Sequence, residues 1–228
     1  MLNVLNNAVP VSCWSCSVAH NDSTLFCPHC SKIQPPPGGD YFSVFGLEPH
    51  LELSSDQLER EFHRLSRRLH PDRFARAEDQ ERVWSLADTA LVNDAYRTLR
   101  DPLRRTEYLL KLTGRKLDDG ATASRKQKTP ADLLEEVFEL NMQFEEMRFA
   151  AKTGERDPQL TADLQAARSK FETLLREVDD ALRQQWKLWD AGDTAAREAA
   201  ADKMVALLDR RRFLANLVRD VHEVLGAA

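Results

Sequence analysis

The chain has 228 residues, of which 30% are charged, and a formal net charge of −5 at neutral pH. This length accommodates more than one domain, and the negative charge argues against bulk nucleic-acid binding, which normally requires a basic surface. No apolar run approaches the roughly 20 residues that a membrane-spanning helix needs. The segment Met1 to Val11 has no Arg or Lys, unlike a secretory signal or transit peptide. We therefore expect a cytoplasmic protein that binds neither membrane nor nucleic acid.

Composition predicts three domains, covering residues 1–39, 40–114 and 115–228. All four cysteines fall in the first, and the run from Pro35 to Gly39 is typical of a linker. A polar stretch from Gly114 to Pro130 separates the other two. Long segments rich in Ala, Leu, Glu and Arg predict an all-α fold, with a small zinc knuckle in front of a helical hairpin and a three-helix bundle.

The cysteines form two C-x2-C pairs separated by ten residues: Cys13, Cys16, Cys27 and Cys30. Two such pairs together provide four thiolates for a tetrahedral metal site, and zinc is the default occupant. Four protein ligands leave no open position, so the site would be structural and not catalytic. Two disulfides, redox-active pairs or rubredoxin-like iron remain alternatives. We expect His20 and His29 to lie outside the coordination shell.

A helical hairpin is predicted after residue 50. Ser54 and Gln57 have the spacing of a capping box, and an apolar stripe with helical periodicity follows: Leu58, Phe62, Leu65 and Leu69. Arginines occupy another face of the same helix: Arg60, Arg64, Arg67 and Arg68. Pro71 would end this helix, and a second one, marked by Val92, Ala95, Tyr96 and Leu99, would end near Asp101. The tripeptide His70-Pro71-Asp72 thus falls in the loop between two amphipathic helices.

Together these features resemble the J-domain, and more specifically the iron–sulfur co-chaperone family HscB. The opening Tyr41-Phe42 with Phe45-Gly46-Leu47, the His-Pro-Asp-x-Phe segment ending at Phe74, and the closing segment Tyr108 to Gly114 match patterns typical of that family. The tetracysteine extension resembles the form found in animal mitochondria, although many bacterial members lack it.

The resemblance implies a co-chaperone that stimulates the ATPase of a DnaK/HscA-class chaperone. The residues it implies for chaperone binding are His70, Pro71, Asp72, Arg60, Arg64, Arg67, Arg68 and Arg73. The arginines would steer the chain toward an acidic chaperone surface, and Asp72 would form a charge-assisted hydrogen bond with a partner arginine. Because the sequence has no phosphate-binding loop or hydrolase motif, we expect no catalytic residues, no bound nucleotide and no enzymatic activity.

Three further helices are predicted over about 131–152, 158–190 and 194–225. The first carries one apolar stripe suited to the bundle core, formed by Leu133, Val137, Leu140, Phe144 and Met147. A second stripe, formed by Leu134, Phe138 and Met142, is interspersed with carboxylates. The pattern leaves open whether this second stripe is buried or is an exposed surface for a partner.

For this helix the resemblance implies docking of the iron–sulfur scaffold protein IscU. The positions that match the family's scaffold-contacting residues are Leu134, Phe138, Glu139, Met142, Glu146 and Phe213. Two positions depart from the pattern: Glu135 replaces a usually apolar residue, and Met142 replaces a usually acidic one. A different client for the bundle, or a thiol-redox protein, are the other interpretations.

Overall fold

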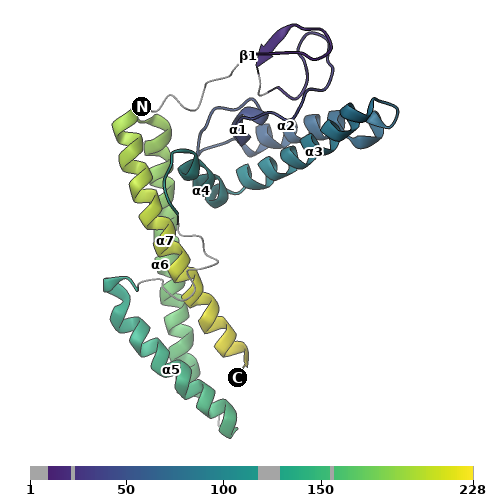
Figure 1. The fold of residues 1–228 in the computed structure, drawn as a ribbon. Helices are drawn as coiled ribbons and strands as arrows, with labels where there is room; N and C mark the ends of the chain where they lie inside the picture. The colour runs from purple at the N-terminus through teal and green to yellow at the C-terminus, as the bar shows by residue number, and fades with distance from the viewer. Residues whose placement is uncertain (1–9, 22–23, 118–128, 155–156, 228) are drawn as a thin grey trace. The chain divides into compact units, whose positions relative to one another are not determined.

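The computed structural model describes residues 10–21, 24–117, 129–154 and 157–227 (Figure 1). The chain separates into two compact units, residues 1–114 and residues 115–228. Most of the polar stretch from Gly114 to Pro130, and the segment before Pro10, lie outside the described residues.

The cysteine module begins with a short hairpin. Strand β1 (Pro10–Ser12) pairs antiparallel with β2 (Ala19–Asn21), with Val11 opposite His20. Each cysteine pair is closed by a serine with a positive φ of 61°, Ser17 in the first pair and Ser31 in the second. Their backbone N–H groups donate to the carbonyls of the first cysteine in each pair, at 2.9 Å. The two strands were not predicted; otherwise the expected all-α class is confirmed.

The helical part of the first unit contains α1 (Tyr41–Val44), α2 (Ser55–Leu69), the 3-10 helix η2 (Pro71–Phe74), α3 (Asp79–Leu99) and α4 (Pro102–Leu112). The side chain of Ser54 accepts a hydrogen bond from Gln57 N at 3.3 Å and caps α2, as its sequence predicts. The apolar stripe of α2 is buried at Leu58, Leu65 and Leu69. The hairpin is therefore held by facing apolar stripes.

Two side chains of α4 tie the ends of this unit together. The buried Arg105 donates to the carbonyl of Leu51 at 3.0 and 2.6 Å, and also to the carbonyl of Leu99. The Tyr108 hydroxyl accepts a hydrogen bond from Tyr41 N at 2.8 Å, and the two rings stack with centroids 4.5 Å apart. Burial raises the pKa of Tyr108 to about 12, so its hydroxyl is neutral at physiological pH.

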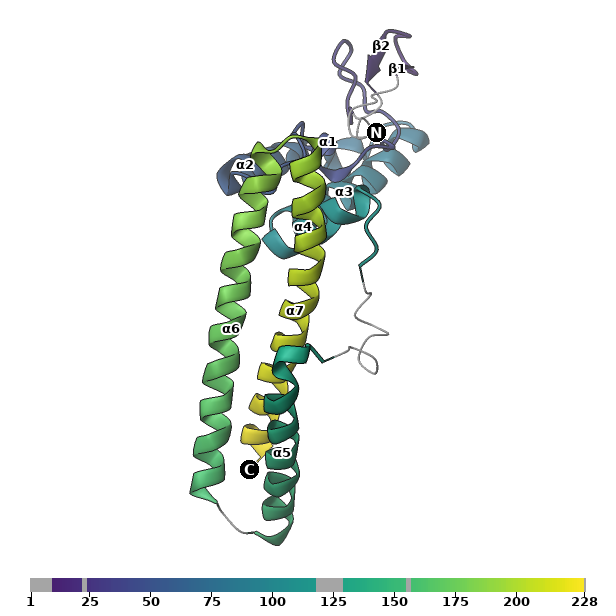
Figure 2. The same cartoon turned by 90° about the vertical axis from the view of Figure 1, so that its left-hand side faces the viewer.

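The second unit contains the 3-10 helix η4 (Ala131–Leu133), α5 (Leu134–Thr153), α6 (Pro158–Ala191) and α7 (Thr194–Ala227). The long helices α6 and α7 run side by side, and α5 packs beside one half of that pair (Figure 2). Gly154, at φ 74°, ends α5 in the left-handed conformation, and Pro158 starts α6 behind the capping side chain of Asp157. The three predicted helices are thus present. Among the described residues, none of the helices is both long and apolar enough to cross a membrane.

Candidate functional sites

The four cysteines converge at one point of the module. Their sulfur atoms all lie within 4.8 Å of one another, and the pairs Cys13–Cys30 and Cys16–Cys27 are both 3.7 Å apart. A tetrahedral zinc site with bonds of about 2.3 Å has sulfur–sulfur edges of about 3.8 Å, so two edges of this donor set already match zinc and the remaining ones are within about 1 Å of it. None of the four forms a disulfide, which separates this arrangement from the alternative of two cystines.

Donors around the site favour thiolates. The backbone N–H of Ser15 and the side-chain amide of Gln34 point at the sulfur of Cys13, at 3.4 and 3.5 Å. His20 is engaged elsewhere, because its ring nitrogens lie 3.0 Å from Gln34 Oε1 and 2.8 Å from Thr24 Oγ1. Among the residues that the structure describes, the cluster of possible metal ligands consists of the four cysteines.

The His-Pro-Asp segment forms a sharp, exposed corner. His70 ends α2 with an extended ψ of 127°, and the 3-10 helix η2 starts directly at Pro71. Nδ1 of His70 accepts a hydrogen bond from Asp72 N at 3.3 Å, while the side chains of His70 and Asp72 remain 59% and 90% exposed. His70 thus shapes the corner, and the Asp72 carboxylate is available to a partner.

Two hydroxyl groups on α3 donate hydrogen bonds to the backbone at this corner. Leu69 is the last residue of α2, and the N–H of Arg73, its donor in a continued helix, bonds instead to the carbonyl of His70 at 2.9 Å. The Leu69 carbonyl therefore needs another donor. Ser85 Oγ donates to the carbonyl of Leu69 at 2.6 Å, and Thr89 Oγ1 donates to the same oxygen at 3.3 Å. The sequence analysis missed both residues; hydroxyls four positions apart on the helix after the loop were the available signal.

Asp88 lies between these hydroxyls in sequence and is completely buried. Neither of its carboxylate oxygens has a hydrogen-bond partner among the described residues. Burial raises the pKa of Asp88 to about 7 from its ordinary value of 3.8, because the ionised form loses its hydration.

The arginines of α2 are not equivalent. Arg60, Arg64 and Arg67 are exposed, and Arg64 pairs with Glu61 at 2.7 Å. Arg68 instead lies over the ring of Phe26 in the cysteine module, 3.9 Å from its centroid. Burial, together with the charges of Arg64 and Arg73, lowers the pKa of Arg68. Arg68 therefore has an intramolecular role that the periodicity alone could not show.

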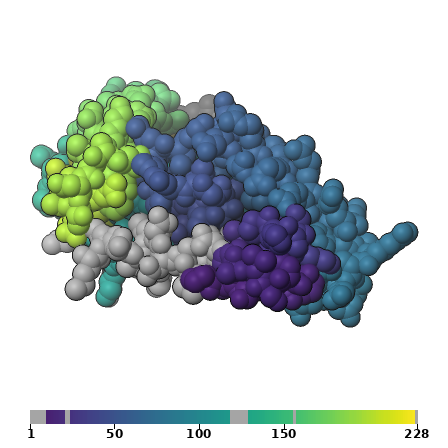
Figure 3. Space-filling view, turned by 90° about the horizontal axis from the view of Figure 1, so that it is seen from above, coloured from purple at the N-terminus to yellow at the C-terminus, as the bar shows by residue number. Residues whose placement is uncertain are grey.

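The cysteine module is packed on helices α2 and α3, as Figure 3 shows for its purple surface against their blue one. Besides the Phe26 contact, Lys32 forms an ion pair at 2.9 Å with Glu81, whose side chain is only 6% exposed. The rings of Trp14 and Trp84 meet edge to face with centroids 5.7 Å apart. A cation, a buried carboxylate and two aromatic contacts thus fix the module on the helical hairpin.

In the second unit, α5 has apolar side chains on two sides. Leu133, Leu140, Phe144 and Met147 are buried in the bundle, and Val137 is half-buried. Leu134, Phe138 and Met142 are 56%, 69% and 53% exposed, which decides the ambiguity of the sequence in favour of a surface stripe. Phe149, 65% exposed, falls between Phe138 and Met142 around the helix axis and extends the stripe, a residue that the sequence analysis did not include.

Carboxylates flank this stripe. Glu139 and Glu146 are both exposed, and each also borders an open groove between α5 and α6, of 380 and 840 Å³ respectively. Phe213 is half-buried on α7, one turn after Arg210, whose guanidinium binds the carboxylate of Asp132 at 2.7 Å near the start of α5. The structure thus places the five predicted residues of α5 together on one helix, whereas Phe213 lies on α7, and no contact between it and the stripe is seen among the described residues.

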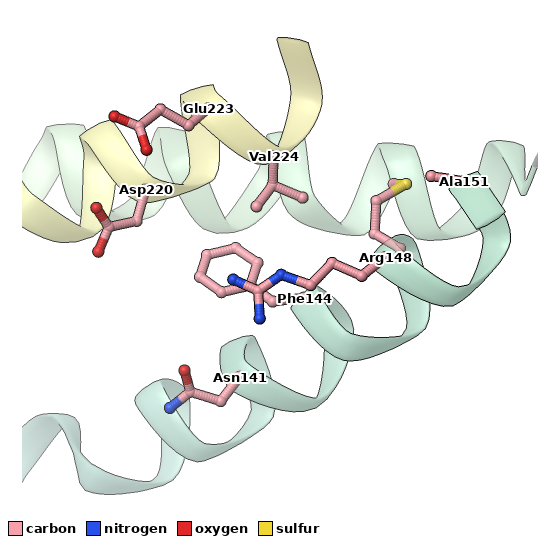
Figure 4. A pocket seen from close by; sticks show the side chains of 8 residues that line it. Asn141, Phe144, Arg148, Ala151, Asp220, Glu223 and Val224 are labelled. Atoms are coloured by element: carbon pink, nitrogen blue, oxygen red, sulfur yellow. The ribbon is translucent and has the colours of Figure 1, made fainter. Parts of the chain in front are cut away.

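A separate pocket of 460 Å³ lies between α5 and α7 (Figure 4). Asn141, Phe144 and Arg148 face Asp220 and Glu223 across it. No predicted scaffold-binding residue lines this pocket, so it is distinct from the surface stripe.

Comparisons with known proteins agree with this architecture. Residues 40–108 match the family model of the DnaJ domain. The iron-sulfur cluster co-chaperone protein HscB of Mus musculus is 29% identical over 215 residues, which cover 92% of this chain and 81% of the mouse protein. The co-chaperone protein HscB homolog of Vibrio cholerae is 33% identical over 187 residues, covering 81% of this chain and 96% of that protein.

Solved structures show the same fold. Chaperone HscB from Vibrio cholerae aligns with a TM-score of 0.54 at 29% identity, over 81% of this chain and 96% of that one. Human co-chaperone protein HscB aligns with a TM-score of 0.66 at 24% identity, over 93% and 97% of the two chains. The J-domain match and the near full-length similarity to the Vibrio proteins show that this chain belongs to the HscB family of J-domain co-chaperones.

Proposed function

We propose that this protein stimulates the ATPase of a DnaK/HscA-class chaperone and delivers the iron–sulfur scaffold protein IscU to it during cluster assembly. The exposed His-Pro-Asp corner, supported by Ser85 and Thr89, is the observation that carries the chaperone part. In this proposal each predicted domain has one binding function: residues 40–114 bind the chaperone, residues 115–228 bind the scaffold, and residues 1–39 bind zinc.

Binding to the chaperone would depend on electrostatic attraction and on hydrogen bonds at the exposed His-Pro-Asp corner. The exposed Arg60, Arg64 and Arg67 would raise the association rate with an acidic surface. Asp72, 90% exposed, would then accept charge-assisted hydrogen bonds from an arginine of the chaperone. The chain would bind the ATP-bound state selectively and shift its partner toward hydrolysis, with no covalent step of its own.

The scaffold step uses the stripe on α5. Leu134, Phe138 and Met142 would be removed from water by the partner, with Glu139 and Glu146 as an acidic rim. Phe213 on α7 would add a second contact to the same partner. Such a rim selects a partner whose surface is apolar at its centre and basic at its edge.

The four cysteines would hold one zinc ion, which supplies folding energy to a segment too small for a core of its own. The ion would have no open coordination position and no chemical role in the ATPase cycle. A cytoplasmic location stays a prediction, checked by cell fractionation.

The first test is ATP hydrolysis by the purified chaperone, with this protein and IscU added singly and together. We expect synergy when both are present, and its loss with His70→Gln. His63→Gln is the matched control, because its side chain lies on the same helix and is exposed to the same extent, 59%. Equal stimulation by wild type and His70→Gln would refute the proposed chaperone step.

The scaffold surface is tested by calorimetry with purified IscU. Leu134→Ala, Phe138→Ala and Phe213→Ala combined should weaken binding at least tenfold, since alanine at a buried apolar anchor commonly costs more than 1 kcal/mol. Leu188→Ala on α6 removes an equally exposed leucine outside the stripe and should change nothing. Unchanged binding of the triple variant would show that the scaffold docks elsewhere, or that the bundle has a different client.

A further inference from the structure

An open groove of 540 Å³ lies where the cysteine module meets the His-Pro-Asp corner. The module contributes Phe26, Ser31 and Lys32 to its lining, and the other wall includes Arg73, Phe74 and Arg76. Its two walls come from segments far apart in the chain, held together by the contacts of Lys32 with Glu81, Trp14 with Trp84 and Phe26 with Arg68.

The groove carries positive charge that no carboxylate of the described residues neutralises. Lys32 is neutralised by Glu81 at 2.9 Å, and the remaining carboxylate on the lining is that of Glu78. The guanidinium groups of Arg73 and Arg76 are exposed and have no ion pair or hydrogen bond with the described residues. Two free guanidiniums beside aromatic rings suit an acidic segment, because Arg binds carboxylates with two parallel hydrogen bonds.

The groove is also continuous with the proposed chaperone site. Arg73 and Phe74 belong to η2, which begins at Pro71. At a rise of about 2.0 Å per residue in a 3-10 helix, Phe74 follows Asp72 by about 4 Å along the axis. A chaperone engaged at Asp72 would therefore already lie over the edge of the groove.

We propose that this groove binds an acidic, extended segment of the partner chaperone, which makes the cysteine module a second wall of the chaperone-binding surface. The inference rests on the proposed chaperone interaction and adds to it a surface outside the J-domain. It gives the module a role in recognition, because the turn that carries Cys27 and Cys30 lies beside the groove wall, and zinc held by the four cysteines would keep that turn in place.

Two serines with the same φ and the same backbone hydrogen bond allow a matched test. Ser31 follows the second cysteine pair and lines the groove, whereas Ser17 follows the first pair and does not line it. Both are exposed and have φ 61°. Aspartate tolerates this left-handed conformation better than most residues do. Ser31→Asp places a carboxylate on the groove wall, Ser17→Asp is the control for charge, and Ser31→Asn is the control for shape.

The measurement is the Kd of the zinc-loaded full chain for the purified chaperone in its ATP state, by surface plasmon resonance at 50 and 300 mM salt. We expect Ser31→Asp to raise Kd about fivefold at low salt, and less at high salt, since charges at an interface rim are screened. Ser17→Asp and Ser31→Asn should stay within about twofold of wild type. Arg76→Glu, which changes the opposite wall and leaves the cysteine module unaltered, should raise Kd about tenfold.

A Ser31→Asp variant that binds like Ser17→Asp, together with an Arg76→Glu variant that binds like wild type, would overturn the inference. His70→Gln distinguishes this failure from failure of the proposed function. If His70→Gln abolishes stimulation while the groove variants bind normally, the chaperone interaction stands and the groove is not part of it.

Discussion

The buried carboxylate of Asp88 makes the stability of the J-domain depend on pH. Its side chain is fully buried, and neither oxygen has a hydrogen-bond partner in the described part of the chain. With a pKa of about 7 in the folded protein and an ordinary value of 3.8, folding favours the protonated form. The full stability is therefore present below about pH 4, is lost progressively as the pH rises toward 7, and changes no further above it.

The size of the effect follows from the shift. Each pKa unit corresponds to 1.36 kcal/mol, so ionised Asp88 costs the folded state about 4 kcal/mol above pH 7. Asp88→Asn removes the titration and keeps the shape of the side chain. We expect the variant and wild type to have similar free energies of unfolding near pH 4, and the variant to be more stable by about 4 kcal/mol at pH 8.

Urea unfolding between pH 4 and pH 8 measures this difference. Trp186→Phe and Trp189→Phe in every protein compared would leave the fluorescence of Trp14 and Trp84, which report on the first unit alone. Asp94→Asn is the matched control, because its carboxylate lies on the same helix and is 60% exposed. A difference between wild type and Asp88→Asn that stays constant across this pH range would refute a raised pKa at Asp88.

Three further outcomes are expected. Ser85→Ala should destabilise the first unit by about 1–3 kcal/mol, because it removes the shorter hydrogen bond to the carbonyl of Leu69, and it should also reduce chaperone stimulation; unchanged urea unfolding would contradict this. Phe149→Ala should weaken IscU binding about threefold to tenfold in calorimetry without changing thermal unfolding, since its ring is 65% exposed; equal affinity would place it outside the scaffold surface. Cys27→Ser should abolish zinc retention, measured as metal per chain after gel filtration, because three thiolates do not close the site; Ser15→Ala is the control, and one zinc per chain in the serine variant would exclude a four-cysteine site.

The features that were predictable from the sequence are local or strictly periodic. Leu58, Leu65 and Leu69 are buried as their spacing predicts, and Ser54 caps α2 as its position before the stripe predicts. The cysteine cluster was also predictable, because each C-x2-C turn fixes two sulfurs through short-range geometry. In each case the information lies within a few residues.

The features that were not predictable depend on contacts between segments distant in the chain. The periodicity of α2 assigns Arg68 to the same surface as Arg64. In the structure the guanidinium of Arg68 instead packs over the ring of Phe26 in the cysteine module. On α5 the sequence contains two apolar stripes, and only packing against α6 and α7 decides that Phe144 is buried and Phe138 is exposed. Tertiary packing decides such cases because a helix with two apolar sides satisfies local preferences in either orientation.

The support of the His-Pro-Asp corner explains why its function depends on the helix that follows it. Because α2 ends at Leu69 and the N–H of Arg73 bonds to the carbonyl of His70, the Leu69 carbonyl relies on Ser85 and Thr89 of α3 for its donors. The loop can thus expose His70 and Asp72 to a partner while the backbone beneath them stays fixed. Asp88 lies on the same helix, between Ser85 and Thr89 in sequence. Its ionisation therefore destabilises the part of α3 that carries these two hydroxyl groups. A change in α3 that contacts no partner should therefore alter chaperone stimulation, through the geometry of a corner that it holds from the inside.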